Sequence, residues 1–154
     1  MSFKNNPENN INFHVLEDAE HPFPSNTIGV ANWLIQVAKI DGKTISNITY
    51  IFCSDEYLLD INQKYLGHDY YTDIITFPYK EITDIESDIY ISLDRVKDNA
   101  SEYNVAFQNE LLRVIVHGLL HLMGYGDKTE EESILMRLKE DQCIELYDRS
   151  KDVS

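Results

Sequence analysis

Residues 116–127, VHGLLHLMGYGD, decide the fold of this chain. They overlap an apolar run over residues 111–123 that is long enough for a helix and apolar on nearly every face, which is typical of a buried helix. His117 and His121 interrupt this run at positions i and i+4, so both imidazoles project from one face, one turn or roughly 6 Å apart. The stretch therefore predicts a buried helix that presents two histidines together.

A carboxylate follows the two histidines across a glycine turn. Gly124 and Gly126 can adopt backbone angles that other residues avoid, and such a turn can fold Asp127 back toward the imidazoles. Two His nitrogens and one carboxylate oxygen are a ligand set of catalytic zinc, with a fourth position for water. The alternative is a pair of core histidines that are hydrogen-bonded to carbonyl groups. Burying two imidazoles costs several kcal/mol unless each finds a partner, and one metal would satisfy both, so the spacing favours a metal site.

The composition is that of one globular domain. A chain of 154 residues is long enough for one domain with a substantial core, and its 43% hydrophobic and 26% charged residues are ordinary for a soluble protein. No apolar run reaches the roughly 18 residues that cross a bilayer, and residues 1–10 carry no secretory signal. We therefore expect a cytoplasmic protein in which Cys53 and Cys143 are reduced, buried thiols.

The charge of the chain is strongly negative. It carries 27 acidic residues against 13 Lys plus Arg, which gives a formal net charge of −14. Such a charge repels nucleic acid in bulk. Any nucleic-acid substrate would therefore be held by a local basic patch, by backbone donors or by a metal.

Four segments have the alternation and the β-branched or aromatic composition of strands. We expect strands over residues 11–17, 43–53, 72–77 and 88–92. Pro22 and Pro24 break the chain after the first strand, Pro78 stops the third, and an acidic loop over residues 81–87 precedes the fourth.

Helical segments alternate with these strands and then follow them. We expect helices from Ser25 or Asn26 to about Asp41, from Ser54 to Gly67, from Leu93 with a break near Asn104 into the histidine-bearing helix, and from just after Asp127 to about Tyr147. Thr129 and Glu132 form a capping box at the start of the last helix. The order predicts one α+β domain over residues 1–154, a small mixed four-stranded sheet covered by about five helices, with loose ends at 1–10 and 148–154.

A histidine pair on a helix first suggests a zinc peptidase. In that design a Glu directly follows the first His and is the general base. Here the residue is Gly118, which accepts no proton. The metal-bearing helix is retained, but peptidase chemistry is disfavoured.

The same stretch resembles the signature of the YbeY family, bacterial metal-dependent endoribonucleases of ribosomal RNA maturation. The family pattern H-G-x-L-H-L-x-G-Y-D-H is matched over residues 117–125. Residues 59–78 resemble the upstream pattern L-N-x-x-Y-R-x-x-D-x-x-T-D-V-L-S-F-P, and residues 87–92 resemble the strand G-D-I-x-I-S. Met136 falls where the family has a Met after the signature. The motifs follow one another in the family's order over about residues 55–136.

The resemblance implies a zincin-like domain that binds one zinc ion and cleaves single-stranded RNA. It places the reaction in 16S ribosomal RNA 3′-end processing and in ribosome maturation or quality control, with ribosomal RNA and the ribosome or ribosomal proteins as partners. The family's three histidine ligands carry over to His117, His121 and Asp127, where Asp replaces the third His. A carboxylate is a normal zinc ligand at about 2.0–2.2 Å. It is harder than imidazole, so another divalent transition metal such as manganese or iron stays open.

A second departure from the family lies in the upstream motif. The family usually has an Arg after the Tyr, thought to contact the phosphate, where this chain has Leu66. We hypothesise that Arg113 takes over part of this catalytic role, because it lies one turn before His117 on the same stripe of the helix. The alternative is that Arg113 forms an ordinary i,i+3 ion pair with Glu110, worth a few tenths of a kcal/mol.

Three further residues are candidates for substrate binding. Asp73 and Thr76 lie on the strand of the upstream motif and could line a cleft, although a polar residue at a strand end is more often a turn cap. Tyr125 could stack on a base, as aromatic residues do with single strands, or could only pack under the turn.

The expected mechanism is hydrolytic: a water whose pKa the metal lowers toward 7 attacks the phosphodiester. The sequence identifies no general base. Two alternatives stay open. One is a metal hydrolase with a non-nucleic substrate, which the acidic charge and Leu66 favour. The other is an RNA- or ribosome-binding assembly factor whose metal is mainly structural.

Overall fold

A computed structural model describes residues 10–16, 19 and 26–153 of the chain. The predictions for the N-terminal end up to residue 9, for Glu17 in the first strand, for the breaks at Pro22 and Pro24 and for a cap at Ser25 lie outside these residues. No helix in the described part of the chain is long and apolar enough to cross a membrane.

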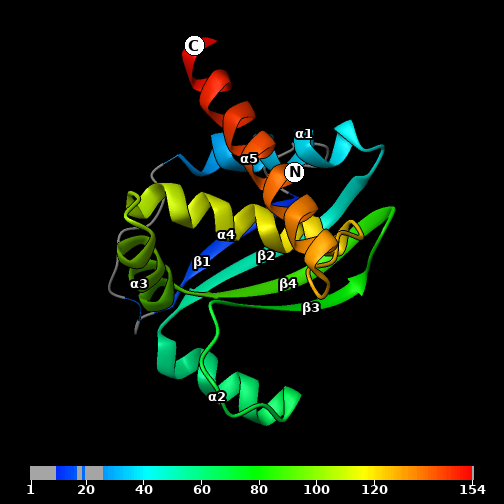
Figure 1. The fold of residues 1–154 in the computed structure, drawn as a ribbon. Coiled ribbons are helices and arrows are strands. Elements are labelled where there is room, and N and C mark those ends of the chain that lie inside the picture. The colour runs from blue at the N-terminus through cyan, green and yellow to red at the C-terminus, as the bar shows by residue number, and fades with distance from the viewer. Residues whose placement is uncertain (1–9, 17–18, 20–25, 154) are drawn as a thin grey trace, which may run out of the picture.

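The centre of the fold is a mixed four-stranded sheet (Figure 1). The strands are β1 (Ile11–Val15), β2 (Thr44–Cys53), β3 (Ile74–Lys80) and β4 (Asp84–Ser92), in the spatial order β1-β2-β4-β3. β1 and β4 both run parallel to β2, whereas β3 is antiparallel to β4. β3 is thus an edge strand that joins β4 through a short hairpin, and the predicted mixed four-stranded sheet is confirmed.

The described residues form five helices, as predicted. They are α1 (Thr27–Ile40), α2 (Asp55–Leu66), α3 (Leu93–Tyr103), α4 (Phe107–Leu122) and α5 (Glu130–Val153). Local signals set their ends: the Asn26 side chain caps α1, Ser54 caps α2, and Gly67 ends α2 at φ 68°. The break at Asn104 is a left-handed residue with φ 58°.

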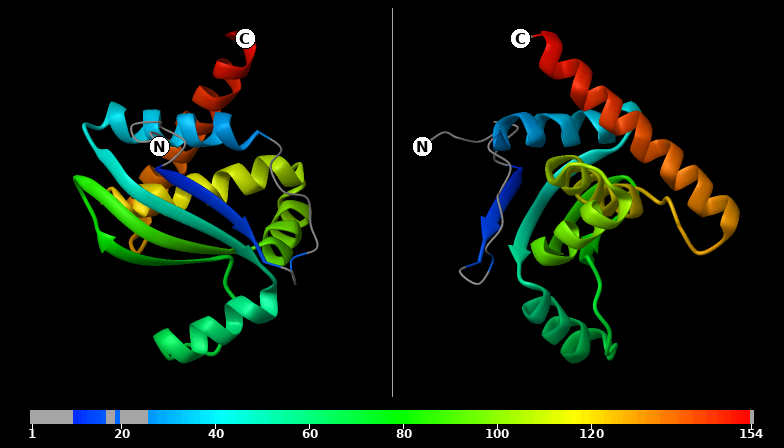
Figure 2. Two further views of the ribbon diagram at one scale, coloured as in Figure 1. Left: turned by 180° about the vertical axis from the view of Figure 1, so that it is seen from behind. Right: turned by 60° about the vertical axis from the view of Figure 1, so that its left-hand side comes forward.

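Four helices, α1, α3, α4 and α5, lie on one side of the sheet, and α2 lies at its lower end (Figures 1 and 2). Most of the core is buried between the sheet and these four helices, with α4 at its centre. A second, smaller cluster of Cys53, Leu58, Ile61 and Ile75 packs α2 against the sheet. Cys53 and Cys143 are free and buried, as predicted.

Some predicted boundaries differ from the structure, and three of the differences have a physical reason or are large. β3 continues through Pro78 to Lys80, because an edge strand does not need the backbone N–H that proline lacks. β4 begins at Asp84, inside the predicted acidic loop, because its acids occupy alternate positions and face away from the buried Ile85 and Ser87. α5 runs to Val153, beyond the predicted end near Tyr147 and through most of the expected loose end.

Gly118 directly follows His117, at the position where a zinc peptidase has Glu. At this residue α4 contacts the sheet. A Cβ at this position would lie 2.9 Å from Ile74 Cδ1 of β3 and 3.4 Å from Ile89 Cδ1 of β4. A Cβ at 2.9 Å would force the tip of the Ile74 side chain to move, so α4 and the hairpin pack closely around a residue that has no side chain.

We predict that Gly118→Leu lowers the free energy of unfolding by about 1–3 kcal/mol, because the added atoms overpack the contact between α4 and β3. Gly118→Ala is the matched control: the methyl group has only to displace the tip of Ile74, and Ala gains roughly 1 kcal/mol of helix propensity over Gly. Urea unfolding of the two variants measures the difference. Equal stability of Gly118→Leu and the wild type would contradict the packing argument.

Candidate metal centre

The predicted ligands His117, His121 and Asp127 come together at the end of α4. One potential ligand atom from each residue lies within 4.8 Å of the others. Asp127 Oδ2 is 3.2 Å from His121 Nε2 and 3.6 Å from His117 Nε2, and the two imidazole rings are nearly perpendicular with centroids 4.5 Å apart. The three atoms therefore converge on one small volume, which a single ion could occupy.

The other nitrogen of each imidazole has an acceptor. His117 Nδ1 lies 2.6 Å from Glu140 Oε2, and His121 Nδ1 lies 2.9 Å from the carbonyl oxygen of Tyr125. A carboxylate and a carbonyl only accept, so in the neutral imidazoles Nδ1 carries the proton and the lone pair is on Nε2. In this arrangement Nε2 faces the other two candidate ligands and Nδ1–H donates a hydrogen bond to another group. It is typical of histidines that ligate a metal.

The turn after α4 places Asp127. Gly124 has φ 112°, a conformation that side chains rarely adopt. Thr129 and Glu132 then form the predicted capping box: the Thr129 hydroxyl accepts from the Glu132 N–H, and the Glu132 carboxylate accepts from the N–H groups of Thr129 and Lys128. Asp127 is thus fixed between the end of one helix and the capped start of the next.

Glu140, which holds His117, belongs to a buried ion-pair network between α4 and α5. Arg113 donates to Glu140 Oε1 and to Asp141 Oδ1, each at 2.9 Å. Burial acts against the charged forms of Glu140 and His117, but their mutual interaction outweighs it, so the pKa of Glu140 is lowered and that of His117 is raised. Arg113 also helps to keep Glu140 ionised.

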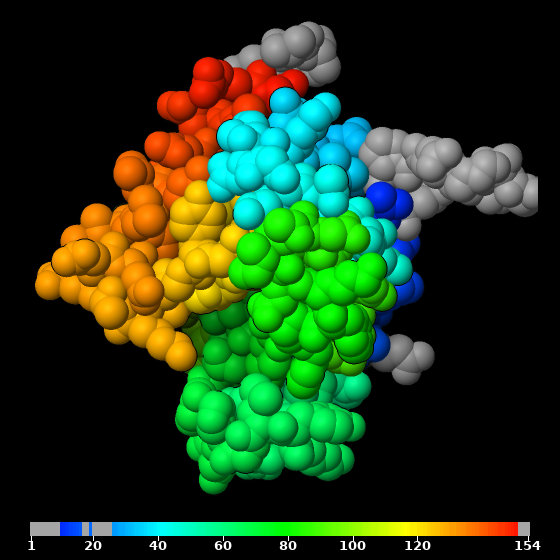
Figure 3. Space-filling model, turned by 90° about the vertical axis from the view of Figure 1, so that its right-hand side faces the viewer, coloured from blue at the N-terminus to red at the C-terminus, as the bar shows by residue number. Residues whose placement is uncertain are grey.

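A cleft of about 540 Å³ opens beside the three ligands. Its walls come from the end of α2, the loop that follows it, β3 and the end of α4, and Figure 3 shows the surface hollowed between α2, the β3–β4 hairpin and the segment after α4. Asp73 and Thr76 line this cleft together with all three candidate ligands, and their role in substrate binding stays a prediction. Burial raises the pKa of Asp73, and Asn99 donates a long hydrogen bond of 3.3 Å to its carboxylate.

Comparison with known proteins identifies the family. A sequence profile described as endoribonuclease YbeY matches residues 14–148. The chain belongs to the YbeY family. Endoribonuclease YbeY of Flavobacterium psychrophilum is 48% identical over 137 residues, 89% of this chain and 91% of that protein. Endoribonuclease YbeY of Cytophaga hutchinsonii is 53% identical over 118 residues, 76% of this chain and 82% of that protein.

A solved structure agrees with this assignment. The solution structure of TM1509 from Thermotoga maritima has a TM-score of 0.67 and 28% identity, over 93% of this chain and 92% of that one. The YbeY family is metal-dependent, and the cluster of His117, His121 and Asp127 gives this member a place for the metal. The resemblance drawn from the motifs is therefore confirmed.

The described residues that line the cleft of this YbeY protein include histidines but no Lys or Arg. Among these residues, Asp73, Glu81 and Asp127 are acidic. Leu66, at the position of the family's Arg, is one of the lining residues. The side chain at this position lines the cleft, so Leu66 in place of Arg leaves this wall of the cleft without a positive charge.

Arg113 and Tyr125 are not among the residues that line this cleft, although Arg113 lines a smaller neighbouring cavity that shares Asp73 and His117 with it. The guanidinium of Arg113 is held by α5, and it pairs with Glu140 and Asp141 rather than with Glu110. The Tyr125 hydroxyl donates to Asp41 Oδ2 at 2.6 Å, and Lys139 lies over its ring. The predicted phosphate contact of Arg113 and base stacking by Tyr125 stay predictions, and these contacts give both residues a structural role.

The sequence analysis missed Glu140. Its signal is the spacing of α5, because Met136, Glu140, Cys143 and Tyr147 recur at i, i+4, i+7 and i+11 and are all buried. A carboxylate on the apolar stripe of a helix is rarely buried without a partner. The position of Glu140 therefore indicates a buried ion pair, although its partner on α4 cannot be found from spacing.

We predict that Glu140→Gln weakens zinc binding about 10- to 100-fold, because His117 loses the carboxylate that orients it and raises its basicity. Asp141→Asn is the matched control, since Asp141 also binds Arg113 but does not contact His117. Competition titration with a chromogenic zinc chelator measures both. Equal weakening in the two variants would mean that the effect passes through Arg113 and not through His117.

Proposed function

We propose that this protein hydrolyses single-stranded RNA with the aid of one zinc ion held by His117, His121 and Asp127. We place the reaction in the cytoplasm, in processing of the 16S ribosomal RNA 3′ end and in ribosome maturation or quality control. The proposal rests on three potential ligand atoms that lie within 4.8 Å of one another. The Nδ1 atoms of both histidines have hydrogen-bond partners, which orient the two imidazoles. The endoribonuclease name of the relatives supports RNA as the substrate.

The donor set fits zinc. Two imidazole nitrogens and one carboxylate oxygen are a donor set that catalytic zinc sites use, and zinc bound by them would accept a water as a further ligand. When bound, zinc lowers the pKa of a coordinated water and stabilises negative charge on a phosphoryl oxygen. Asp127 in place of the family's third histidine brings one negative charge to the site, which also suits manganese or iron.

The other residues of the cleft bind and orient the substrate in this proposal. The Thr76 hydroxyl donates to a phosphate oxygen, and the Asp73 carboxylate accepts from a ribose hydroxyl or from water. Arg113 is a positioning residue, because it keeps Glu140 ionised and Glu140 holds the Nδ1 proton of His117. Tyr125 positions His121 through its carbonyl oxygen.

A second candidate function follows from the charge of the cleft. A cleft lined by three acids and no Lys or Arg among the described residues favours a neutral or cationic substrate over a polyanion. The protein would then be a metal hydrolase acting on an ester or an amide. Turnover of such a substrate by zinc-loaded protein that leaves single-stranded RNA intact would select this candidate.

We predict that purified wild-type protein binds about one zinc per chain and that His117→Ala, His121→Ala and Asp127→Ala lose the zinc and RNA cleavage together. Asp127→His, which restores the family's third histidine, retains both. His14→Ala is the control, because His14 is an exposed histidine on β1. Elemental analysis and a cleavage assay with unstructured RNA give the two readouts. Zinc retained in Asp127→Ala would remove Asp127 from the ligand set.

We predict that Leu66→Arg increases affinity for single-stranded RNA about tenfold, because it adds a cation to a cleft wall whose described residues carry none. One added phosphate contact should also steepen the salt dependence of binding, with the slope of log K against log[salt] changing by about −0.7. Leu66→Gln is the matched control of similar reach without charge. A gain that is equal in both variants, or no change of slope, would contradict an electrostatic effect.

A further inference from the structure

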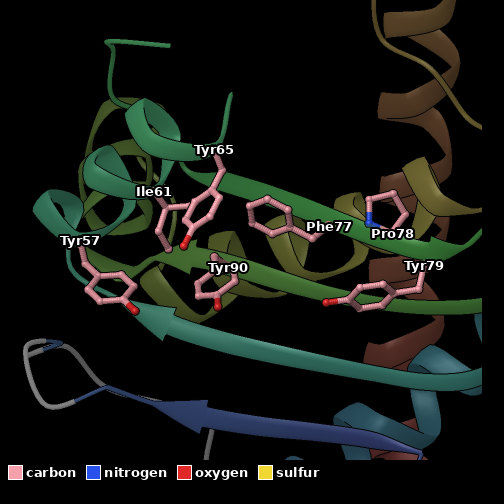
Figure 4. Close-up of a pocket in the computed structure, with 7 residues that line it drawn as sticks. All are labelled: Tyr57, Ile61, Tyr65, Phe77, Pro78, Tyr79 and Tyr90. Carbon is pink, nitrogen blue, oxygen red and sulfur yellow. The ribbon is translucent and has the colours of Figure 1, made fainter. Parts of the chain in front are cut away.

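An aromatic groove lies on the opposite face of β3 from the metal cleft. Its volume is about 400 Å³, and Figure 4 shows the lining side chains from α2, β3 and β4: Tyr57, Ile61, Tyr65, Phe77, Pro78, Tyr79 and Tyr90. The rings form pairs, with Tyr57 stacked on Tyr90 at 6.4 Å and Tyr65 edge-on to Phe77 at 6.1 Å. Tyr65 is 71% exposed and Tyr79 63% exposed. The fold thus leaves large aromatic faces open to solvent without using them in the core.

The groove and the metal cleft share two elements. Along β3, Ile74, Ile75 and Thr76 line the cleft, and the next three residues, Phe77, Pro78 and Tyr79, line the groove. On α2, Leu66 lines the cleft and Tyr65 lines the groove. β3 is also an edge strand, so a chain that leaves the cleft over its free edge arrives at the groove.

The carboxylates near the groove outnumber the cations that contact them. The nearby carboxylates have these partners: Asp60 with Lys64 at 3.1 Å, Asp84 and Glu86 with Lys80 at 3.7 and 3.9 Å, and Asp88 with the Tyr79 hydroxyl at 2.8 Å. Lys64 and Lys80 are the two cations in these contacts, and Asp88 keeps its charge because the Tyr79 hydroxyl donates only a hydrogen bond. The exposed ring faces, and not cations of the protein, are therefore what the groove offers to a ligand.

We propose that the aromatic groove binds unpaired bases of the RNA whose backbone passes through the metal cleft. This rests on the proposed function, which brings single-stranded RNA to the cleft. Tyr65 and Tyr79 stack on the bases, which every sequence of bases allows because each base has a π face. Stacking supplies the affinity that the cleft, without Lys or Arg among its described residues, does not obtain from phosphate contacts. Paired bases cannot enter, so the groove selects single strands.

The test is binding of zinc-loaded protein to a fluorescein-labelled, single-stranded oligonucleotide with 2′-O-methyl riboses, which is not cleaved. Tyr65→Ala and Tyr79→Ala each weaken binding about 5- to 150-fold, the range for loss of one stacked base. Tyr65→Phe keeps the ring and binds like the wild type. Ile134→Ala, at an exposed apolar residue of α5, is the control for loss of exposed apolar surface. Zinc content and circular dichroism of each variant show that the site and the fold are intact.

A second arm removes the bases instead of the rings. An oligonucleotide with several abasic nucleotides binds the wild type as weakly as the intact one binds Tyr65→Ala. Intact affinity in both alanine variants, or an equal loss in Tyr65→Phe, would overturn the proposal. So would variants that bind RNA normally but lose binding of poly-lysine, since the groove would then be a site for a basic protein.

Oligonucleotide binding and RNA cleavage are measured separately, so failure of one proposal can be distinguished from failure of the other. If the wild-type protein binds the oligonucleotide through Tyr65 but does not cleave unmodified RNA, the proposed hydrolytic function is contradicted and the proposed base binding by the groove is supported. Wild-type protein that cuts RNA, with alanine variants that bind normally, would support the hydrolytic function and overturn the groove.

Discussion

The whole site depends on how closely α4 packs against the β3–β4 hairpin. α4 is buried on most of its faces, and the missing side chain at Gly118 lets it approach Ile74 and Ile89. The histidine-bearing edge of the helix then borders β3 instead of lying in the core. The hairpin turn is tied to the same helix, because the Ile82 N–H donates to the carbonyl oxygen of Leu122. The contact between α4 and the hairpin therefore contributes to the core and also positions one wall of the cleft against the other.

A second constraint comes from α5, which returns across α4 and carries a buried carboxylate. An unpaired buried charge is strongly destabilising, so Glu140 is tolerated only because Arg113 and His117 both contact it. The candidate ligand His117 is thus part of the ion-pair network that joins the two helices. Docking of α5 and the orientation of His117 are coupled, and a metal that prefers this orientation stabilises the fold as well.

The sequence predicted the elements and the three clustered candidate ligands better than the contacts that surround them. Caps, glycines and apolar periodicity are local, so the helix starts at Asn26 and Ser54 and the i,i+4 histidine pair could be found without the structure. The extension of β3 through Pro78 could not be predicted from the sequence, because it depends on the position of β3 at the edge of the sheet. The contact between Glu140 and His117 spans 23 residues and depends on how two helices cross, which no local pattern encodes.

The acidity of the chain is consistent with an RNA substrate if affinity does not come from cations. A net charge of −14 opposes any polyanion at long range, but it does not act on the faces of the bases. In the proposed arrangement the metal site neutralises the phosphate that reacts, and exposed rings on the far side of β3 bind the neighbouring bases. Leu66 in place of the family's Arg fits this proposal, in which phosphate and bases bind at separate sites. The substitution removes a phosphate contact and leaves the aromatic groove unchanged. Discrimination against duplex RNA then follows from the geometry of stacking, since bases in a helix have no free faces to offer.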